Sequence, residues 1–386
     1  MVNDINYEHY LRQIRLQEVG VHGQKKINEA KVLIIGLGAL GTPNVQYLAA
    51  AGVGTIGIVE GDVIEISNLH RQVLYNYTDI NRSKSEATKE YIQKINPNTI
   101  VKEYNVFLTT ENALEIIDDY DIVINGTDNF PTRYLINDAC VLLSKPLVDA
   151  SILRFSGQVT IFKPGLGCYR CLFPTPPAHN SVPNCTEVGV LGPVAGHIGS
   201  LQAVETLKLI LEIGKPLNGR LVVYDALKGR HITVDYNKDK NCPICGIKPS
   251  IKKLINYEEF CGVPKKESLN PQAQVTENGW SLNPSEVNEL TKRKAIQVID
   301  IRPTSEYVKM HIEDSESLQI TEIFEDLSVI DGFSKAVLVC HSGEKSSLIT
   351  LKLRELGLSN VFNMYGGINL WLFQNLHLAE KRVEAT

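Results

Sequence analysis

KVLIIGLGALGTPNVQYLAAAGVGTIGIVEGDVIEISNLHRQ, residues 31–72, sets the architecture of the first part of this chain. Residues 32–35 form a continuous apolar run with β-branched side chains, which is typical of a parallel strand buried on both faces. A helix is predicted from about Thr42 to Gly52, with Pro43 in its first turn. Residues 55–59 form a second apolar run. This strand–helix–strand pattern predicts an α/β fold with a parallel sheet.

A glycine-rich turn joins the first strand to the helix. Gly36, Gly38 and Gly41 allow a tight turn, a close approach of backbone N–H groups to a phosphate, and close packing of the helix on the strand. Glu60 ends the second strand, where a carboxylate usually holds a nucleotide ribose. The pattern favours a nucleotide site over a purely structural strand–turn–helix. Because the same turn serves NAD, FAD and ATP, other residues have to identify the nucleotide.

Length and composition favour a soluble protein of two domains. The chain has 386 residues, 43% of them hydrophobic and 22% charged, with a net charge of −5. It lacks the basic character of a nucleic-acid-binding protein, and no apolar run approaches the ~18 residues of a membrane span. The first residues lack the basic start and apolar core of a signal peptide. We therefore expect a cytoplasmic protein with reduced cysteines, whose partners are proteins and small molecules.

Polar residues gather after two of the predicted strands. Those after the second strand include Asn68, Arg71, Gln72 and Lys84. Each alone is typical of a solvated surface, but a cluster beyond a nucleotide fold favours a triphosphate, whose transfer needs donors around developing negative charge. Asp128 follows another buried strand, residues 121–125. It is either the cap of the next helix or a Mg²⁺ ligand beside phosphates, and we expect the ligand.

Two CxxC pairs stand far apart in the chain. The four residues are Cys168, Cys171, Cys242 and Cys245. In a cytosolic protein such pairs supply the four thiolates of a tetrahedral Zn²⁺ site, which is structural because protein fills every position. Two redox motifs or unrelated structural cysteines are the alternatives.

A polar loop with a further cysteine separates the two pairs. Residues 173–193 are rich in Pro, Asn, Ser and Gly and carry Cys185, and a helix is predicted over residues 197–212. A cysteine on such a loop is accessible, so it is either a nucleophile or an incidental thiol.

A polar stretch then leads to a second α/β unit. Residues 263–281 show no sustained periodicity and are predicted to be a linker. Strands are predicted at residues 297–301, 335–339 and 361–364. Cys340 ends the middle strand and is followed by a tight loop and a helix, where backbone N–H groups stabilise a thiolate or persulfide. A buried structural thiol is the alternative.

Together these motifs resemble a known pair of families. Residues 5–262 resemble the MoeB/ThiF adenylyltransferases, relatives of ubiquitin-activating E1 proteins. The motifs that carry the resemblance are Arg12-Gln13-Ile14, GLGALG, SNLHRQ, Lys84, TDNFPTR, both CxxC pairs, Asn184-Cys185-Thr186-Glu187 and GSLQAVE. Residues 284–378 are similar to a rhodanese domain through VIDIR, Tyr307, His311-Ile312, the Cys340 loop, Gly366-Gly367 and Trp371. The fusion resembles MoeZ-type proteins and molybdopterin-synthase sulfurylases.

The resemblance implies a Rossmann-like E1 adenylation domain with a mixed sheet and a structural zinc over residues 1–262. A linker over residues 263–283 and a smaller α/β rhodanese-like domain over residues 284–378 would follow. The implied reaction is ATP-dependent adenylation of the C-terminal glycine of a ubiquitin-like sulfur carrier ending in Gly-Gly. Sulfur from a Cys340 persulfide, supplied by a donor such as a cysteine desulfurase, would then give a thiocarboxylate.

The resemblance also implies roles for individual residues. Glu60, with Asp62 nearby, would hold the ribose; Asn68, Arg71, Gln72 and Lys84 would bind the phosphates; Asp128, beside Asn129, would coordinate Mg²⁺. Gly36, Gly38, Ala39 and Gly41 would form the nucleotide loop. Arg12 would reach the active site of the other subunit of a homodimer, and Cys185 would form a covalent intermediate or resolve an acyl disulfide.

This sequence departs from the family pattern at a few positions. Glu60 stands where aspartate is usual, and His341 and Lys345 replace the arginines that usually flank the thiol loop. The molybdopterin carrier is the favoured substrate, and the thiamine carrier and a cysteine- or tRNA-thiolation carrier are the alternatives. A non-catalytic carrier-binding scaffold and an NAD-dependent oxidoreductase are rivals from other classes.

Overall fold

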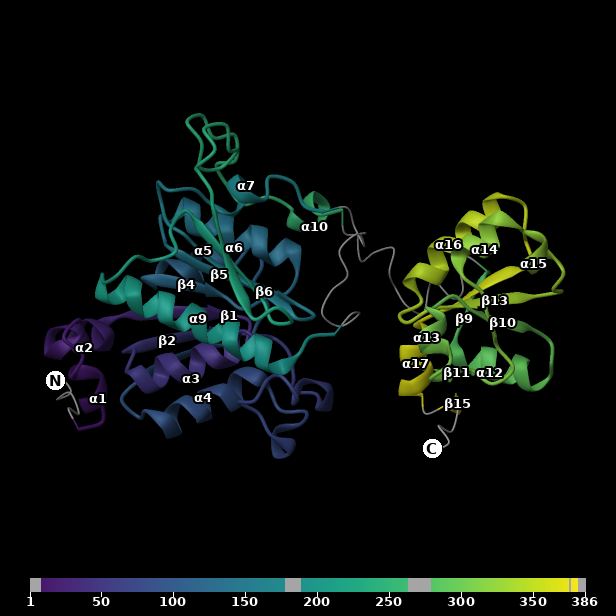
Figure 1. Cartoon of the computed structure of the whole chain (residues 1–386), viewed down its shortest axis with the longest axis horizontal. Coiled ribbons are helices and arrows are strands. Elements are labelled where there is room, and N and C mark those ends of the chain that lie inside the picture. The colour runs from purple at the N-terminus through teal and green to yellow at the C-terminus, as the bar shows by residue number, and fades with distance from the viewer. Residues whose placement is uncertain (1–7, 178–188, 263–278, 375, 381–386) are drawn as a thin grey trace. The chain divides into compact units, whose positions relative to one another are not determined.

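The computed structural model describes residues 8–177, 189–262, 279–374 and 376–380. The chain divides into two compact units, Met1–Val263 and Pro264–Thr386 (Figure 1). Among the described residues, no helix combines the length and apolar character that crossing a membrane requires.

The first unit is built on one eight-stranded sheet with the strand order β3-β2-β1-β4-β5-β6-β7-β8. The first five strands in that order pair in parallel, and β6, β7 and β8 pair antiparallel. The strands are β1 (Lys31–Ile35), β2 (Thr55–Val59), β3 (Ile100–Tyr104), β4 (Ile122–Asn125), β5 (Leu147–Leu153), β6 (Ser156–Phe162), β7 (Arg220–Asp225) and β8 (Arg230–Asp235). The predicted mixed sheet is confirmed.

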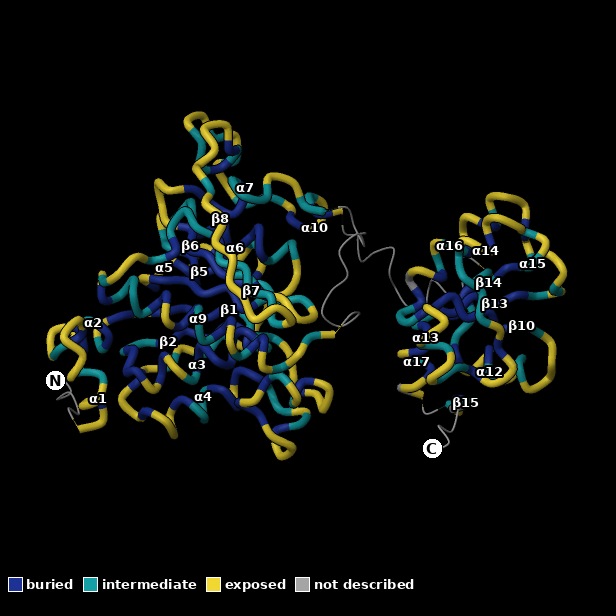
Figure 2. Tube along the Cα trace, viewed as in Figure 1, coloured by how far each residue is buried: buried dark blue, intermediate teal, exposed yellow. Residues whose placement is uncertain are grey.

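Helices cover both faces of this sheet. They are α1 (Leu11–Ile14), α2 (Gly20–Glu29), α3 (Gly41–Ala51), α4 (Lys84–Ile95), α5 (Ala113–Asp118), α6 (Phe130–Leu142), α7 (Tyr169–Leu172), α9 (Gly192–Leu211) and α10 (Tyr257–Phe260), with 3₁₀ turns at Ile66–Asn68 and Tyr77–Asp79. Val32 and Ile34 pack into a core with residues of α3, α4 and α9. Leu33 and Ile35 pack on the opposite face with residues of α5 and α6. Both faces of β1 are therefore buried (Figure 2), which explains its unbroken apolar run.

Helix α3 has the predicted bounds to within one residue. It ends at Gly52, whose φ of 92° is left-handed and whose N–H group bonds the carbonyls of Leu48 and Ala49. This is the helix end that glycine favours. The space beside Gly52 is filled by Tyr10, whose hydroxyl accepts a 2.7 Å hydrogen bond from Asn96. The N-terminal segment is thereby anchored to the end of α3.

Helix α9 begins five residues before the predicted start at residue 197. Pro193 lies in the first turn of the helix, and Val194, Ala195 and Ile198 are buried. The Gly-Pro pair that suggested a loop is therefore the helix start, because proline at a first-turn position has no N–H group to lose. The sequence prediction of this boundary was wrong.

The second unit has a five-stranded sheet with the order β12-β10-β13-β14-β9 and a two-stranded ribbon of β11 and β15. Its strands are β9 (Ser281–Leu282), β10 (Gln297–Asp300), β11 (Met310–His311), β12 (Glu316–Ser317), β13 (Ala336–Val339), β14 (Val361–Met364) and β15 (Ala379–Glu380). Its helices are α12 (Pro284–Lys292), α13 (Thr304–Tyr307), α14 (Ile320–Glu325), α15 (Ser328–Asp331), α16 (Glu344–Glu355) and α17 (Gly367–Phe373).

Strand β9 lies inside the stretch predicted as a linker. Ser281 and Leu282 pair in parallel with Asn363 and Met364 of β14. These two residues therefore belong to the sheet of the second unit, whereas residues 263–278 lie outside the described part of the chain.

Candidate functional site

A cavity of about 330 Å³ lies at the carboxyl ends of β1, β2 and β4 in the first unit. This edge is where open parallel sheets bind ligands. Of the residues predicted to bind the nucleotide, those that line the cavity are Gly36, Gly38, Ala39, Glu60, Asp62, Asn68, Arg71, Gln72, Lys84, Asp128 and Asn129. The structure thus brings together residues that span more than ninety positions of the sequence.

The glycine turn is packed backbone against backbone. A Cβ atom on Gly41 would lie 2.0 Å from the carbonyl oxygen of Gly36, and one on Gly36 would lie 2.9 Å from the carbonyl carbon of Gly126. Gly41, also predicted to bind the nucleotide, does not line the cavity. Gly38 and Ala39 line the cavity, and their N–H groups donate no hydrogen bond within the described residues. Free donors at the start of a helix suit an anionic group.

Glu60 organises the end of β2. Its Oε2 atom accepts a 3.0 Å hydrogen bond from the Leu37 N–H group, and its Oε1 atom accepts from the N–H groups of Gly61 and Asp62. The carboxylate therefore joins the glycine turn to the residues that follow β2. Each carboxylate oxygen has two acceptor sites, so Oε2 keeps capacity for a ligand hydroxyl.

Lys84 supplies a buried cation beside this carboxylate. Its Nζ atom lies 3.1 Å from Asp62 Oδ2 and 3.9 Å from Glu60 Oε2, and only 7% of its side chain is exposed. Lys84 is the first residue of α4, after the N-cap Ser83. A cation held here by two acids faces the cavity and suits a polyphosphate.

Gln72 has an unused polar atom at the cavity. Its Oε1 atom is buried and has no hydrogen-bond partner among the described residues. The amide lies near Gly38, where an added Cβ atom would be 3.7 Å from Gln72 Nε2. Buried polar groups are normally paired, so an unpaired one in a cavity wall points to a bound ligand or water. Arg71, in the same wall, donates to the carbonyl of Ser67 at 2.7 Å.

Asp128 presents a carboxylate that the rest of the described chain leaves unpaired. It is exposed and lines the cavity, and no ion pair or hydrogen bond of its side chain occurs among the described residues. The helix cap that was the alternative role for Asp128 belongs instead to Asn129, whose Oδ1 atom accepts a 2.9 Å hydrogen bond from the Thr132 N–H group. The Asp128 oxygens are therefore free for a cation.

A buried network that sequence reasoning missed supports the Asp128 loop. Arg133 donates to both oxygens of Asp149, at 3.1 and 3.2 Å, and also to the carbonyls of Thr127 and Ala150. Asn125 donates to Asp149 at 2.6 Å and accepts from Thr127. Burial raises the pKa of Asp149, while Arg133 and Asn125 act in the opposite direction. The sequence signal that could have revealed this network is the presence of charged Arg133 and Asp149 among otherwise apolar residues of a helix and a strand.

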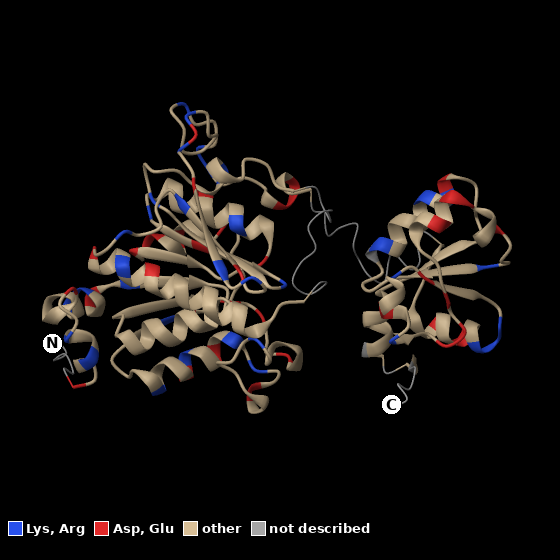
Figure 3. Ribbon diagram, viewed as in Figure 1, with Lys and Arg blue, Asp and Glu red and all other residues tan. Residues whose placement is uncertain are grey.

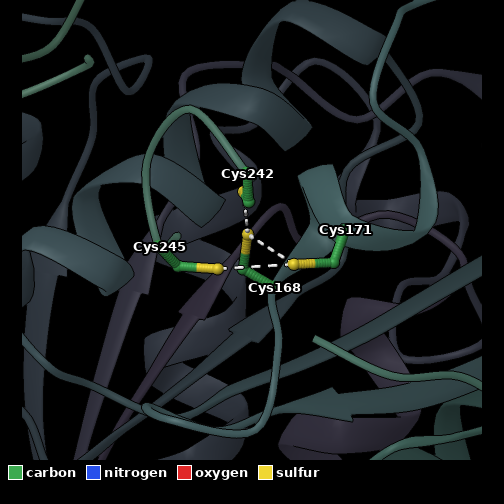
Figure 4. Close-up of side chains that lie close together, drawn as sticks. All are labelled: Cys168, Cys171, Cys242 and Cys245. Carbon is green, nitrogen blue, oxygen red and sulfur yellow. Dashed lines mark hydrogen bonds between the residues drawn. The ribbon is translucent and has the colours of Figure 1, made fainter. Parts of the chain in front are cut away.

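The four cysteines of the CxxC pairs converge in the first unit (Figure 4). Their Sγ atoms all lie within 4.8 Å of one another, with separations of 3.9 Å for Cys168–Cys171, 3.6 Å for Cys168–Cys242 and 3.3 Å for Cys171–Cys245. Tetrahedral Zn²⁺ with Zn–S bonds of about 2.3 Å places its thiolates about 3.8 Å apart. Hydrogen bonding from Cys168 lowers the pKa of Cys171. The donor set and its spacing fit zinc.

A buried ion pair holds the first CxxC turn in place. Arg170 donates to both oxygens of Asp138 at 2.8 Å, and Tyr257 donates to the same carboxylate at 2.9 Å. The guanidinium also lies against the rings of Tyr134 and Phe260, 4.9 and 4.4 Å from their centroids. The cysteine cluster is thus connected to α6 and α10 through charged and aromatic contacts.

Cys340 follows β13 in the second unit and is buried. Its Sγ atom accepts hydrogen bonds from the N–H and hydroxyl groups of Ser346, at 3.4 and 3.3 Å, in the first turn of α16. A Cβ atom on Gly343 would lie 2.6 Å from the Gly366 N–H nitrogen, so the loop packs tightly on the turn before α17. These donors stabilise negative charge on sulfur.

An acidic residue stands beside the Cys340 loop. His341 Nε2 lies 2.5 Å from Glu306 Oε2 of α13. Arg302 forms a buried pair with Asp300 at 2.6 Å and donates to the carbonyl of Met310. The loop thus carries a histidine paired to a carboxylate.

Two predicted site residues lie outside these clusters. Arg12 is exposed on α1 and does not line the cavity of its own chain. Cys185 lies outside the described residues.

In both units, Lys and Arg are interspersed with Asp and Glu along the chain (Figure 3).

Family models match both units. The ThiF family model matches residues 10–244, and the rhodanese-like domain model matches residues 283–374. The predicted E1-like and rhodanese-like resemblances are confirmed.

Curated relatives and a solved structure agree with these matches. The sulfur carrier protein adenylyltransferase of Thermus thermophilus is 49% identical over 66% of this chain and 97% of its own length. The adenylyltransferase and sulfurtransferase MOCS3 of Caenorhabditis briggsae is 40% identical over 94% of this chain and 93% of its own length. The crystal structure of E. coli MccB with MccA-N7isoASN has a TM-score of 0.57 and 24% identity over 63% of this chain and 76% of that chain, which shows a shared fold.

Proposed function

This chain belongs to the ThiF family and carries a C-terminal rhodanese-like domain, and from this we propose that it activates a ubiquitin-like sulfur carrier with ATP and then transfers sulfur to it. The first unit adenylates the C-terminal glycine of the carrier. The second unit supplies sulfur as a persulfide on Cys340. The product is a carrier thiocarboxylate.

The cavity of the first unit carries the adenylation proposal. It combines the free N–H groups of Gly38 and Ala39, the buried cation of Lys84 and the unpaired carboxylate of Asp128. Adenylation joins a carboxylate oxygen to the α-phosphorus of ATP and expels pyrophosphate, so charge develops on the phosphates. Preorganised donors and cations stabilise that charge. An NAD-dependent oxidoreductase leaves Lys84 and Asp128 without a role.

Asp128 is the residue that would hold Mg²⁺ against the phosphates. Magnesium prefers hard oxygen donors and is usually bound through one or two carboxylates together with substrate phosphates. The unpaired Asp128 carboxylate fits this requirement, and the ion would neutralise charge on the departing pyrophosphate. Arg71 and Gln72 also line the cavity and would contact the phosphates.

Sulfur transfer follows from the chemistry of the acyl-adenylate. The terminal sulfur of the Cys340 persulfide attacks the glycyl carbonyl carbon, a C–S bond forms, and AMP leaves. A thiol then attacks the Cys340 sulfur of the resulting acyl disulfide, releasing the thiocarboxylate and leaving Cys340 in a disulfide. We propose Cys185 as that thiol. A cellular dithiol reduces the new disulfide, and a persulfide donor such as a cysteine desulfurase reloads Cys340.

The four cysteines are proposed to hold a structural Zn²⁺. Four protein thiolates leave no open position for substrate, so the ion would stabilise the fold rather than act on the carrier. We also propose a homodimer in which Arg12 serves the partner's cavity. Arg12 is exposed and does not line the cavity of its own chain, which supports this role.

Carrier-dependent exchange between ATP and labelled pyrophosphate tests the proposal. The full chain is assayed with the molybdopterin carrier and with the thiamine carrier, each ending in Gly-Gly. We expect exchange with the molybdopterin carrier. Exchange with the thiamine carrier alone moves the proposal to that pathway, and carrier binding without any exchange supports the scaffold alternative.

Asp128→Asn is the decisive variant in this assay. The change keeps the shape of the side chain and removes the charge, so we expect exchange to fall at least about 100-fold. Glu115→Gln, on an exposed carboxylate of α5, is the matched control and should exchange like the natural protein. Unchanged exchange in Asp128→Asn would contradict the magnesium role.

A further inference from the structure

Two histidines meet on the first unit away from the nucleotide cavity. The Nε2 atoms of His197 and His231 lie 3.0 Å apart. His197 is on α9 and His231 is on β8, and neither lines the cavity at the strand ends. No step of the proposed reaction uses them.

The two rings are held in place by aromatic packing. Tyr224 of β7 pairs with His231 across the ladder, and their rings stack with centroids 4.7 Å apart. The same Tyr224 ring lies 4.5 Å from the His197 ring. Both histidines are therefore oriented by one tyrosine on rigid secondary structure, which is the support that ligand groups need.

The pair has the properties of a chelate. Both histidines are exposed, so an ion can reach them from solvent. Neutral imidazole nitrogen is a common ligand for transition metals.

From this geometry we propose that His197 and His231 form a surface binding site for a divalent transition metal of the Ni²⁺ or Cu²⁺ type. Metal–nitrogen bonds of about 2.0–2.1 Å to nitrogens 3.0 Å apart make an angle of about 94° at the ion. Tetrahedral Zn²⁺ would need a nitrogen separation of about 3.3 Å. The near-right angle instead fits neighbouring positions of a tetragonal or octahedral site.

The site offers two protein ligands. Among the described residues, no third Cys, Asp, Glu or His side chain joins the histidine pair, since the cysteine cluster is the one group of three or more such side chains. Water would therefore fill the remaining positions around the ion. Bound metal would tie α9 to the hairpin of β7 and β8.

Ni²⁺ binding to the untagged full-length protein tests the site, because Ni²⁺ does not oxidise the cysteines. The protein is first loaded with zinc so that the four-cysteine cluster is filled, then dialysed and titrated with Ni²⁺ by calorimetry. We expect one equivalent of Ni²⁺ to bind while the zinc content stays constant.

Four variants identify the ligands. Removing a group that only orients a metal ligand weakens metal binding by about 10–100-fold. Removing a ligand itself should cost at least as much, so His197→Ala and His231→Ala should each lower the Ni²⁺ affinity at least about tenfold. The double variant should bind no more weakly than either single variant, because one histidine cannot chelate. His22→Ala, an exposed histidine of α2, is the matched control and should bind normally.

His231→Gln separates a metal site from a simple hydrogen-bonded pair. His231→Gln can still hydrogen-bond His197, so it should keep the urea midpoint of the natural protein and lose Ni²⁺ affinity. The proposal is overturned if the natural protein binds no Ni²⁺, or if the alanine and glutamine variants bind it as the natural protein does.

Discussion

Replacing Arg133 by methionine removes the guanidinium that faces the buried carboxylate of Asp149. Arg133 is 5% exposed and Asp149 is 3% exposed, so water cannot take over the lost contacts. Methionine is close to the arginine stem in length and preserves most of the packing. The variant therefore isolates the charge and its hydrogen bonds.

The expected loss of stability is large. Removing one partner of a buried ion pair lowers the free energy of unfolding by about 3–5 kcal/mol, because a charge is left uncompensated. Arg133 also donates to the carbonyls of Thr127 and Ala150, which would lose these donors. We therefore expect a value in the upper part of that range.

The pH dependence of this loss has a definite sign. Burial already raises the pKa of Asp149 in the folded protein, and removing Arg133 raises it further. An acid with a higher pKa folded than unfolded is stabilised by protonation, so the loss is largest above the folded-state pKa and shrinks as the pH falls through it. For the same reason, Asp149→Asn should stabilise the Arg133→Met protein while destabilising the natural one.

Urea unfolding of the full chain can measure this because the two tryptophans, Trp280 and Trp371, both lie in the second unit. Tryptophan fluorescence therefore reports unfolding of the second unit. Circular dichroism reports both units, so the part of its transition that has no counterpart in fluorescence belongs to the first unit. Arg133→Met should shift only this first-unit transition. A shift below about 1 kcal/mol, or a further loss on adding Asp149→Asn, would refute the reasoning.

Four further predictions concern single positions. Cys242→Ser removes one of four thiolates, so the bound zinc per chain should fall and thermal unfolding of the first unit should occur earlier; full zinc content in the variant would exclude a four-cysteine site. Ser346→Ala removes the hydroxyl donor to Cys340 and should lower persulfide on Cys340 several-fold by cyanolysis, whereas Ser347→Ala, one residue further along α16, should not. Lys84→Met should lower ATP–pyrophosphate exchange at least about tenfold with little change in carrier binding, and equal losses in both would point to a folding defect. Gly41→Ala should fail to give soluble first unit, because its Cβ atom would lie 2.0 Å from a backbone oxygen; a folded, ATP-binding variant would show that the turn can relax.

Local patterns explain why much of the fold was predictable. The run at residues 32–35 lies in a strand buried on both faces, and the left-handed Gly52 ends the helix that its spacing predicted. These features depend on neighbours in sequence, so pattern and conformation coincide. Gly192-Pro193 failed as a loop indicator because the same residues are favourable in the first turn of a helix, and the burial of Val194 decides between the two.

Features that depend on distant partners were harder to predict. Strand β9 has only two residues, which is too short for any periodicity to be read from its sequence. It is a strand because it pairs with β14. The network of Asn125, Arg133 and Asp149 joins three elements whose proximity is a property of the folded sheet. By contrast, the nucleotide-site residues could be grouped in advance, because strand ends of a parallel sheet share one edge.

The two cysteine turns also have a consequence for the order of folding. Cys168 and Cys242 are 74 residues apart. At a synthesis rate of about 5–20 residues per second, the second turn leaves the ribosome about 4–15 s after the first. During that interval the nascent chain holds only half of the thiolates, while β7 and β8 are still being made. Capture of the proposed zinc by all four thiolates therefore has to wait until β7 and β8 have been synthesised.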